Sequence, residues 1–253
     1  MYNAEKADYY ARYRPELHDD ALAPFLTGRE FAHGLDVGCG TGHSTHALLR
    51  YCRAVTGVDN SRPMLDRARP HERIRYGLVQ AGRWPVADGQ ANVITIAGAL
   101  FYLDPTALVR ELRRAAAPDC RIIVYDFTFD PAPLLLALGI GADEIPVEDY
   151  ADSCDLPSSA GEGSFVSDGA PLSLEILYFM TLENVAWLLL AEDGCRTALL
   201  QRYGSADGAR ESITRLSPGA GTWNKWMVRF RVVARAYRLA SERGSGPAAV
   251  MTE

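Results

Sequence analysis

The stretch LDVGCGTG, residues 35–42, decides the fold class of this 253-residue chain. Leu35–Val37 is a short apolar strand that glycines cut off at positions 38, 40 and 42, and Ser44–Tyr51 then has the composition of a helix. A glycine turn between a strand and a helix lets the backbone approach a ligand closely. By itself this turn is a weak signal, because many nucleotide-binding proteins share it.

Strand and helix signals alternate around this turn through the first half of the chain. The sequence predicts strands at 35–37, 54–58, 74–79, 92–97 and 121–127, and helices at 44–51, 63–69 and 105–116. Alternation of this kind is typical of βαβ units, which build a parallel sheet with helices on both faces. We therefore expect an α/β fold with a doubly wound, mostly parallel sheet.

The second half of the chain has a different pattern. A short helix is expected at Pro131–Gly139, and residues 141–171, which are acidic and rich in Gly, Ser and Pro, are expected to form an inserted loop or lid. A strand is expected at Leu172–Thr181, helices at 183–190 and 196–203, and a long final strand at Trp223–Tyr237. Two late strands joined by a helical excursion add an antiparallel edge to the sheet. If nothing covers the final strand, it could serve as an exposed edge.

Composition excludes several classes of protein. No run of about 18 apolar residues could span a membrane, and the polar, aromatic N-terminus MYNAEKADYY is unlike a secretory signal. The five cysteines have no CxxC spacing and the five histidines form no HExxH pattern. We therefore expect a cytoplasmic protein without a membrane span, a disulfide framework or a metal site.

Charge is distributed unevenly along the chain. Residues 122–195 contain no Lys or Arg but many acids, whereas the final stretch is rich in Arg. One interpretation is that the two segments neutralise each other in the fold; the other is that the acids attract a cationic substrate. Neither segment resembles a basic surface with interleaved aromatic residues, so nucleic acid is not an expected partner.

Three residues narrow the ligand of the glycine turn. A dinucleotide fingerprint needs glycine at position 43, where this chain has His43. Asp36, directly before the glycines, would repel a pyrophosphate but would suit an ammonium group. Asp59 ends the second strand, where a carboxylate can accept both hydroxyls of a ribose. The pattern favours a nucleoside that carries an amino-acid cation, and it disfavours an NAD-dependent oxidoreductase.

These features resemble the class I S-adenosylmethionine-dependent methyltransferases, and in particular their small-molecule branch. The resemblance extends from about Tyr9 to Phe127. It is strong at LDVGCGTG, clear at VTGVDNSRPMLDRA (55–68) and recognisable at VQAGRWPVADGQANVITIAGALFYLDP (79–105). It implies a Rossmann-like methyltransferase fold, S-adenosylmethionine as cofactor and S-adenosylhomocysteine as product.

The resemblance also implies a division of the chain within a single domain, 1–253. Residues 1–30 would form helices that cover the cofactor, and 31–130 would form the cofactor-binding core. Residues 131–222 would supply the lid and substrate region with a late strand, and 223–240 the final strand.

The cofactor-binding residues are implied by the same resemblance. Asp36 would hold the methionyl amine, and Asp59 would bind the ribose. The other implied contacts are Gly38 and Gly40 along the backbone, Asn60, Met64, Gln80 and Ala81 around the adenine, Ala97 near the methyl group, and Tyr13 and Arg14 over the cofactor.

Two positions depart from the family pattern. Relatives usually carry Asp where this chain has Gln80, whose carbonyl oxygen can still accept the adenine amino proton. Relatives also often place a histidine near Leu100–Phe101, and this chain has none there. A histidine base from that position is therefore not available.

Three other residues are candidates for catalysis. His18 follows the segment expected to cover the site, and it is either a base or an exposed helix histidine. Tyr102 and Asp126 lie at the carboxyl ends of expected strands, where open α/β sheets bind ligands. Tyr102 could form a pocket wall or bond the acceptor. Asp126 could orient a substrate amine or simply cap local backbone.

The predicted function is methyl transfer from S-adenosylmethionine to a small organic acceptor. A nitrogen acceptor is slightly favoured over oxygen because of the acidic stretch. Nearly all basic residues are Arg and alanine is abundant, as in GC-rich bacterial coding, which suits a natural-product intermediate and antibiotic biosynthesis. The alternative is an enzyme of the same fold that catalyses a non-methylating cyclisation or rearrangement. The sequence leaves monomer and homodimer open.

Overall fold

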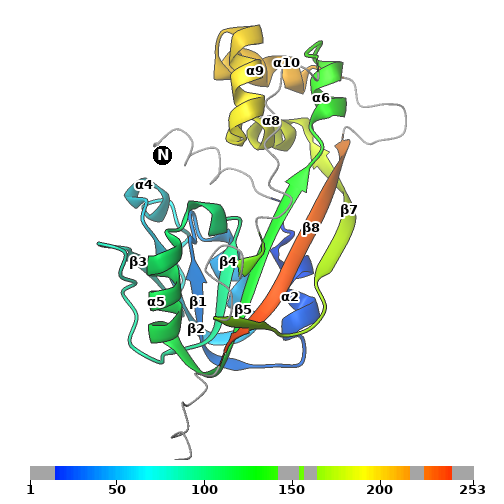
Figure 1. Cartoon of the computed structure of the whole chain (residues 1–253). Coiled ribbons are helices and arrows are strands. Elements are labelled where there is room, and N and C mark those ends of the chain that lie inside the picture. Colours follow the sequence, from blue (N-terminus) through cyan, green and yellow to red (C-terminus); the bar gives the residue numbers. More distant parts are fainter. Residues whose placement is uncertain (1–14, 142–153, 157–163, 217–224, 241–253) are drawn as a thin grey trace, which may run out of the picture.

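A computed structural model describes residues 15–141, 154–156, 164–216 and 225–240. Its centre is an eight-stranded sheet in the order β3-β2-β1-β4-β5-β8-β6, with β7 also paired to β8 (Figure 1). The first five strands are mutually parallel. They are β1 (Phe31–Val37), β2 (Cys52–Asp59), β3 (Ile74–Leu78), β4 (Ala91–Ala97) and β5 (Ala116–Phe129). The doubly wound, mostly parallel sheet is confirmed.

The remaining strands form the antiparallel edge that the sequence predicts. The long strand β8 (Lys225–Leu239) runs antiparallel to β5. On its other side β8 pairs with β6 (Phe165–Ser167) and then with β7 (Leu172–Thr181). The final strand is therefore covered by β6 and β7, so it does not serve as the exposed edge that it could have formed without a partner.

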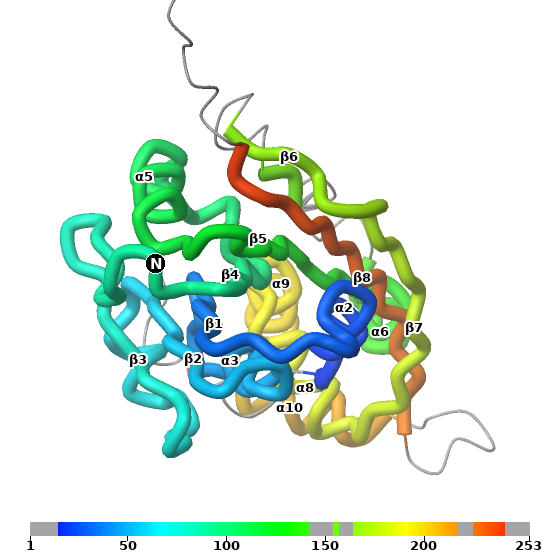
Figure 2. The backbone as a smooth tube through the Cα atoms, turned by 90° about the horizontal axis from the view of Figure 1, so that it is seen from below, coloured from blue at the N-terminus to red at the C-terminus, as the bar shows by residue number. Residues whose placement is uncertain are grey.

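Two helical layers cover the sheet on opposite faces. Helices α2 (His18–Leu26) and α3 (His43–Leu48) pack on one face with Ile123 and Tyr125, and α5 (Pro105–Ala115) packs on the other with Ile122 and Val124. Figure 2 shows α5 and the pair α2 and α3 on either side of the strands. Alternate residues of β5 thus face different helices, as a strand buried on both faces requires.

Short local signals set the bounds of several helices. Helix α5 begins after Asp104, whose side chain accepts the N–H of Ala107 at 2.7 Å, and Pro105 occupies its first turn. Helix α4 (Arg62–Leu65) also carries proline in its first turn. The 3₁₀ helix η1 (Leu100–Tyr102) follows β4 directly.

A helical cap lies between β7 and β8 in the sequence and above the sheet in Figure 1. It comprises α8 (Leu182–Ala191), α9 (Asp193–Tyr203) and α10 (Ala206–Thr214), with α6 (Ala132–Ala137) beside it. The Arg210 guanidinium of α10 lies 5.0 Å from the centre of the Trp187 ring of α8. Helix α10 and strand β6 are additions to the elements expected from the sequence.

Candidate functional site

The parallel strands bring the candidate residues to one edge of the sheet. Because β1 to β5 run in the same direction, their carboxyl ends meet there. Five candidates occupy or directly follow neighbouring strand ends: Asp36, Asp59, Gln80, Ala97 and Asp126. This edge is the candidate site.

The glycine turn after β1 is tightly packed at its first and third glycines and open at the second. Gly38, Gly40 and Gly42 all have positive φ, which glycine adopts without strain. A Cβ on Gly38 would lie 2.4 Å from Cβ of Ala99, and one on Gly42 would lie 2.3 Å from Oη of Tyr76. A Cβ on Gly40 would meet no protein atom within 4 Å. Gly40 is therefore the point at which a ligand can approach the turn.

Asp59 ties the glycine turn to the end of β2. Its Oδ2 accepts the N–H of Gly40 at 2.8 Å, and its Oδ1 accepts the N–H of Ser61 at 2.7 Å. Burial raises the pKa of Asp59, while these backbone hydrogen bonds lower it. Each carboxylate oxygen keeps a further lone pair, so the side chain can still accept hydroxyl groups of a ligand.

Asp36 is fully buried beneath the turn rather than exposed at the site. Its Oδ2 accepts the hydroxyls of Ser44 at 2.6 Å and Thr45 at 2.7 Å, and its Oδ1 accepts the hydroxyl of Thr95 at 2.8 Å. Burial raises the pKa of Asp36 to about 6 against the lowering effect of these hydrogen bonds. In this arrangement the carboxylate supports the turn, and its contact with a methionyl amine stays a prediction.

The residues expected around an adenine lie beside β2 and β3. Asn60, Gln80 and Ala81 are exposed, whereas Met64 is buried. Ala81 has a φ of 49° in the tight turn that joins Gln80 to Arg83. The hydroxyl of Ser61 is buried next to Asp59 and has no hydrogen-bond partner in the structure.

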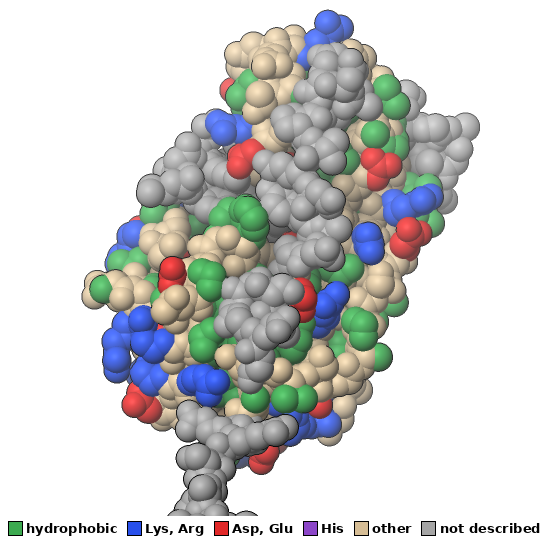
Figure 3. All heavy atoms as spheres, viewed as in Figure 1, with side chains coloured by type: hydrophobic (Ala, Val, Ile, Leu, Met, Phe, Trp, Pro, Cys, Tyr) green, Lys and Arg blue, Asp and Glu red, His purple; other side chains and the backbone are tan. Residues whose placement is uncertain are grey.

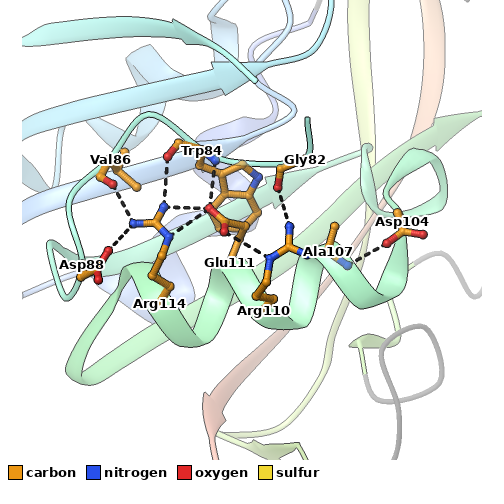
Figure 4. A network of polar contacts seen from close by, with 9 residues as sticks. All are labelled: Gly82, Trp84, Val86, Asp88, Asp104, Ala107, Arg110, Glu111 and Arg114. Atoms are coloured by element: carbon orange, nitrogen blue, oxygen red, sulfur yellow. Dashed lines mark hydrogen bonds and ion pairs between the residues drawn. The ribbon is translucent and has the colours of Figure 1, made fainter. Parts of the chain in front are cut away.

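Arg114 of α5 anchors the loop that leaves β3 (Figure 4). Its guanidinium donates to the carbonyl of Trp84 at 3.0 Å, to Glu111 at 2.7 Å and to Asp88 at 2.7 Å. Burial would raise the pKa of Glu111, but hydrogen bonds from Arg114 and the Trp84 N–H outweigh it and hold the pKa below its ordinary value. The loop that begins near Gln80 is thereby fixed to α5.

The other end of the site lies over β4 and β5. Ala97 ends β4, and a Cβ on the next residue, Gly98, would lie 3.1 Å from Oδ1 of Asp126. Asp126 also accepts the N–H of Phe127 at 2.7 Å. Tyr102 lies in η1 with its side chain 54% exposed. The Asp126 carboxylate therefore lies next to the end of β4, whereas the Tyr102 side chain is exposed to solvent.

His18 meets β5 on the opposite face of the sheet from Asp126. Its Nδ1 lies 3.0 Å from Oη of Tyr125, and its ring packs edge-on against Tyr125 and Phe127. Burial raises the pKa of Tyr125 well above its ordinary value, so its phenol stays neutral. His18 is half-buried at the start of α2. Two further candidates, Tyr13 and Arg14, lie outside the described residues.

Sequence reasoning missed several polar partners at this site. Thr95 is a polar residue in the buried run VITIA, and that contrast is a signal for its contact with Asp36. Ser44 and Thr45 face Asp36 from the helix that follows the turn. Tyr125 carried no comparable signal, because aromatic residues are common in buried strands.

Three described acids of residues 122–195 form ion pairs with arginines. Asp155 contacts Arg235 at 3.0 Å, and Asp168 contacts both Arg121 and Arg238. In the cap, Glu183 lies 3.5 Å from Arg210. These contacts support the interpretation that the two segments neutralise each other.

The stretch that carries the glycine turn and Asp59 matches a known family. Residues 35–124 match the model of a family described as a methyltransferase domain. The chain is thus similar to methyltransferases from β1 into β5, and the cofactor that this similarity implies is S-adenosylmethionine. The open side of Gly40, the carboxylate of Asp59 and the unpartnered hydroxyl of Ser61 fit a ligand with ribose hydroxyls.

Individual relatives support this assignment. A malonyl-[acyl-carrier protein] O-methyltransferase from Halorhodospira halophila is 33% identical over 187 residues, which are 68% of this chain and 62% of that protein. A trans-aconitate 2-methyltransferase from Delftia acidovorans is 40% identical over 83 residues, 32% of this chain and 30% of that protein. The chain thus spans less than two thirds of the length of these curated relatives.

A solved structure shows the same fold. It is described as a type II methyltransferase from Anaeromyxobacter dehalogenans, with a TM-score of 0.63 and 22% sequence identity. The similarity covers 88% of this chain and 97% of that one. In the part of the chain that the structure describes, no helix has the length and apolar character needed to cross a membrane.

Proposed function

We propose that the protein transfers a methyl group from S-adenosylmethionine to an oxygen atom of a small organic acceptor. The observation that carries this proposal is the pairing of the Gly40 N–H with Asp59 at the carboxyl edge of the sheet. It places a ligand-accessible glycine beside a carboxylate that retains hydrogen-bonding capacity. Bound there, the cofactor supplies a methyl group that is already electrophilic.

The chain's own residues then bind and orient. The Asp59 carboxylate would accept hydrogen bonds from the ribose hydroxyls, and the Ser61 hydroxyl would donate one to the ribose. The adenine base would be surrounded by Asn60, Met64, Gln80 and Ala81. Gly38 and Gly40 would leave room for the backbone to approach, and Ala97 would lie near the reacting end. Alignment of donor and acceptor and exclusion of water are the main requirements of such a displacement.

An oxygen acceptor is favoured over the nitrogen acceptor that the sequence suggested. The reason for expecting a cationic substrate was the acidic stretch, and two of its described acids, Asp155 and Asp168, are instead neutralised by ion pairs with Arg235, Arg121 and Arg238. The names of the relatives also point to oxygen, since one is an O-methyltransferase that acts on a malonyl group. A carboxylate acceptor would need no base, whereas a hydroxyl acceptor would.

For a hydroxyl acceptor, Asp126 and His18 are the candidate bases. Asp126 lies beside Gly98 at the end of β4, on the face that also carries α5. His18 lies on the other face of β5, where its Nδ1 contacts the hydroxyl of Tyr125, and it would have to reach the acceptor from that face. Tyr102 would form an outer wall of the acceptor site. A natural-product acceptor stays a prediction.

Calorimetric titration with S-adenosylmethionine tests the cofactor site. The wild type should bind, and Asp59→Ala should weaken binding at least tenfold because it removes the acceptor of the Gly40 N–H and of the ribose. Asp207→Ala is the matched control, since that carboxylate is 92% exposed in the cap and should leave affinity unchanged. Absence of binding to the wild type would refute the proposal.

Product analysis tests the reaction. With a panel of carboxylic acids, phenols and amines, we expect one S-adenosylhomocysteine released per methylated product, and mass spectrometry should place the methyl group on oxygen. Methylation of an amine would contradict the oxygen assignment. Turnover without S-adenosylhomocysteine would instead support a cyclisation or rearrangement.

A further inference from the structure

The ribbon formed by β7 and β8 carries an exposed apolar cluster. Antiparallel partners lie on the same face of a sheet, and here Leu177 pairs with Arg229 while Phe179 pairs with Met227. The side chains of Leu177, Phe179 and Met227 are 53%, 53% and 49% exposed. The other face of the ribbon, with Phe230, is buried. Exposed apolar clusters of this kind mark interaction sites.

Basic residues surround this cluster on the same face. Lys225, Arg229 and Arg231 are exposed, and none of the three has an ion-pair partner in the described part of the chain. Glu175, opposite Arg231, is the one acid on this stretch of the ribbon face. In Figure 3 basic, hydrophobic and some acidic side chains lie together on the right-hand flank, where Figure 1 draws β7 and β8. We call Leu177, Phe179, Lys225, Met227, Arg229 and Arg231 the β7–β8 patch.

The positive charge of the β7–β8 patch favours an acidic binding partner over a second copy of the chain. The chain as a whole has a net charge of −6, yet between Lys225 and Arg231 the β7–β8 pair presents three basic residues on this face against one acid, Glu175. Two copies that met through this face would bring six unpaired basic side chains together, which costs free energy. An acidic partner with an apolar contact surface would instead neutralise the arginines and cover the apolar cluster.

The patch lies next to the acceptor end of the candidate site. Asp126 pairs with Val233 and Thr128 pairs with Arg231, so all four side chains share one face of the sheet. Two residues along a strand span about 7 Å, and Arg231 is therefore one such step from the level of Asp126. A partner seated on the patch would stand close enough to deliver an acceptor group to the end of β4 and β5.

We propose that the β7–β8 patch docks an acidic carrier protein, which presents the methyl acceptor to the site on a flexible arm. This rests on the proposed function, because the carrier delivers the acceptor for methyl transfer. Arg229 and Arg231 bind acidic side chains of the carrier, and Phe179 and Leu177 supply the apolar contact. The helical cap and the cofactor residues take no part in this contact.

Binding of a purified bacterial acyl carrier protein, in its holo form and as its malonyl thioester, tests the proposal. The wild type should bind both forms in fluorescence anisotropy, and higher salt should weaken binding. Arg229→Glu with Arg231→Glu should weaken it at least tenfold, and Phe179→Ser severalfold. Arg29→Glu, another exposed arginine, is the control and should bind like the wild type.

Titration with S-adenosylmethionine on the same preparations separates this proposal from the proposed function. All variants should keep the wild-type affinity for S-adenosylmethionine, because the patch lies outside the cofactor residues. A wild type that binds S-adenosylmethionine but no carrier protein would overturn the docking proposal and leave the function intact. So would equal carrier binding by the double variant, or sedimentation showing that the patch only joins two copies of the chain.

Discussion

Replacement of Thr95 by valine should destabilise the protein by about 2 kcal/mol at pH 8. The Thr95 hydroxyl donates to Oδ1 of Asp36 at 2.8 Å, and both residues are 0% exposed, so water cannot replace the lost donor. A hydrogen bond to a charged group contributes about 1.5–3 kcal/mol, and valine keeps the shape of threonine. For a chain of this size, 2 kcal/mol corresponds to a fall in Tm of about 4–8 °C.

The stability lost in Thr95→Val should depend on pH because Asp36 titrates. Burial raises its pKa to about 6 from an ordinary 3.8, so the folded protein binds this proton more tightly than the unfolded chain does. Wild-type stability should therefore decline as pH rises from about 4 to about 6, and then level off. Loss of the Thr95 donor disfavours the charged carboxylate and raises the pKa of Asp36 further. The deficit of Thr95→Val should thus be largest at pH 8 and shrink below pH 6.

Urea unfolding at pH 5 and pH 8, followed by tryptophan fluorescence, measures both quantities. The background variant Asp36→Asn is the control, because it removes the titrating carboxyl and should make the effect of Thr95→Val independent of pH. An equal deficit at pH 5 and pH 8 in the wild-type background would refute the reasoning. So would a valine variant as stable as the wild type.

Four further substitutions test other parts of the site. Gly40→Ala should cost about 1–2 kcal/mol of backbone strain and weaken S-adenosylmethionine binding in calorimetry, whereas Gly38→Ala should destabilise more, because its Cβ would lie 2.4 Å from another side chain. Arg114→Ala should cost about 1.5–3 kcal/mol in urea unfolding, because the buried Glu111 carboxylate loses its shortest ion pair and keeps only the Trp84 N–H and Arg110, whose Nε lies 3.6 Å away. Tyr125→Phe removes the hydrogen bond to His18 and should lower kcat severalfold without changing the affinity for S-adenosylmethionine; a change in that affinity alone would contradict a role in placing the imidazole.

The sequence predicts the parallel half of the fold well because its signals are local. Each strand from β1 to β5 contains apolar residues and is bounded by glycine, proline or polar residues. The helices that connect these strands follow in the predicted order. The late strand Leu172–Thr181 also agrees with its predicted bounds. What the sequence could not supply is the partner of the final strand. That β7 rather than β8 forms the edge depends on pairing between segments about 50 residues apart.

Other misses also have physical causes. Helix α10 was overlooked because Ala206–Thr214 has few apolar residues, although Ser205 caps it by accepting the N–H of Gly208 at 3.0 Å. The burial of Asp36 was missed for a related reason. Its position before the glycines suggested a ligand contact, but the three hydroxyls that surround it come from α3 and from β4, 59 residues away. Burial depends on such long-range contacts, which spacing along the chain does not encode.

Strand direction explains why cofactor and acceptor residues can come from separate parts of the chain. The parallel strands β1 to β4 end at the site edge, so their turns supply the cofactor residues. Strand β8 is antiparallel to β5 and therefore starts at this edge, which places Lys225, Arg229 and Arg231 there. The cap helices fill the connection from β7 to β8 and must lie at the same edge. Changes in that connection can alter the acceptor while the turn at Gly38–Gly42 stays the same, so acceptor choice in this protein should follow the late strands and not the glycine turn.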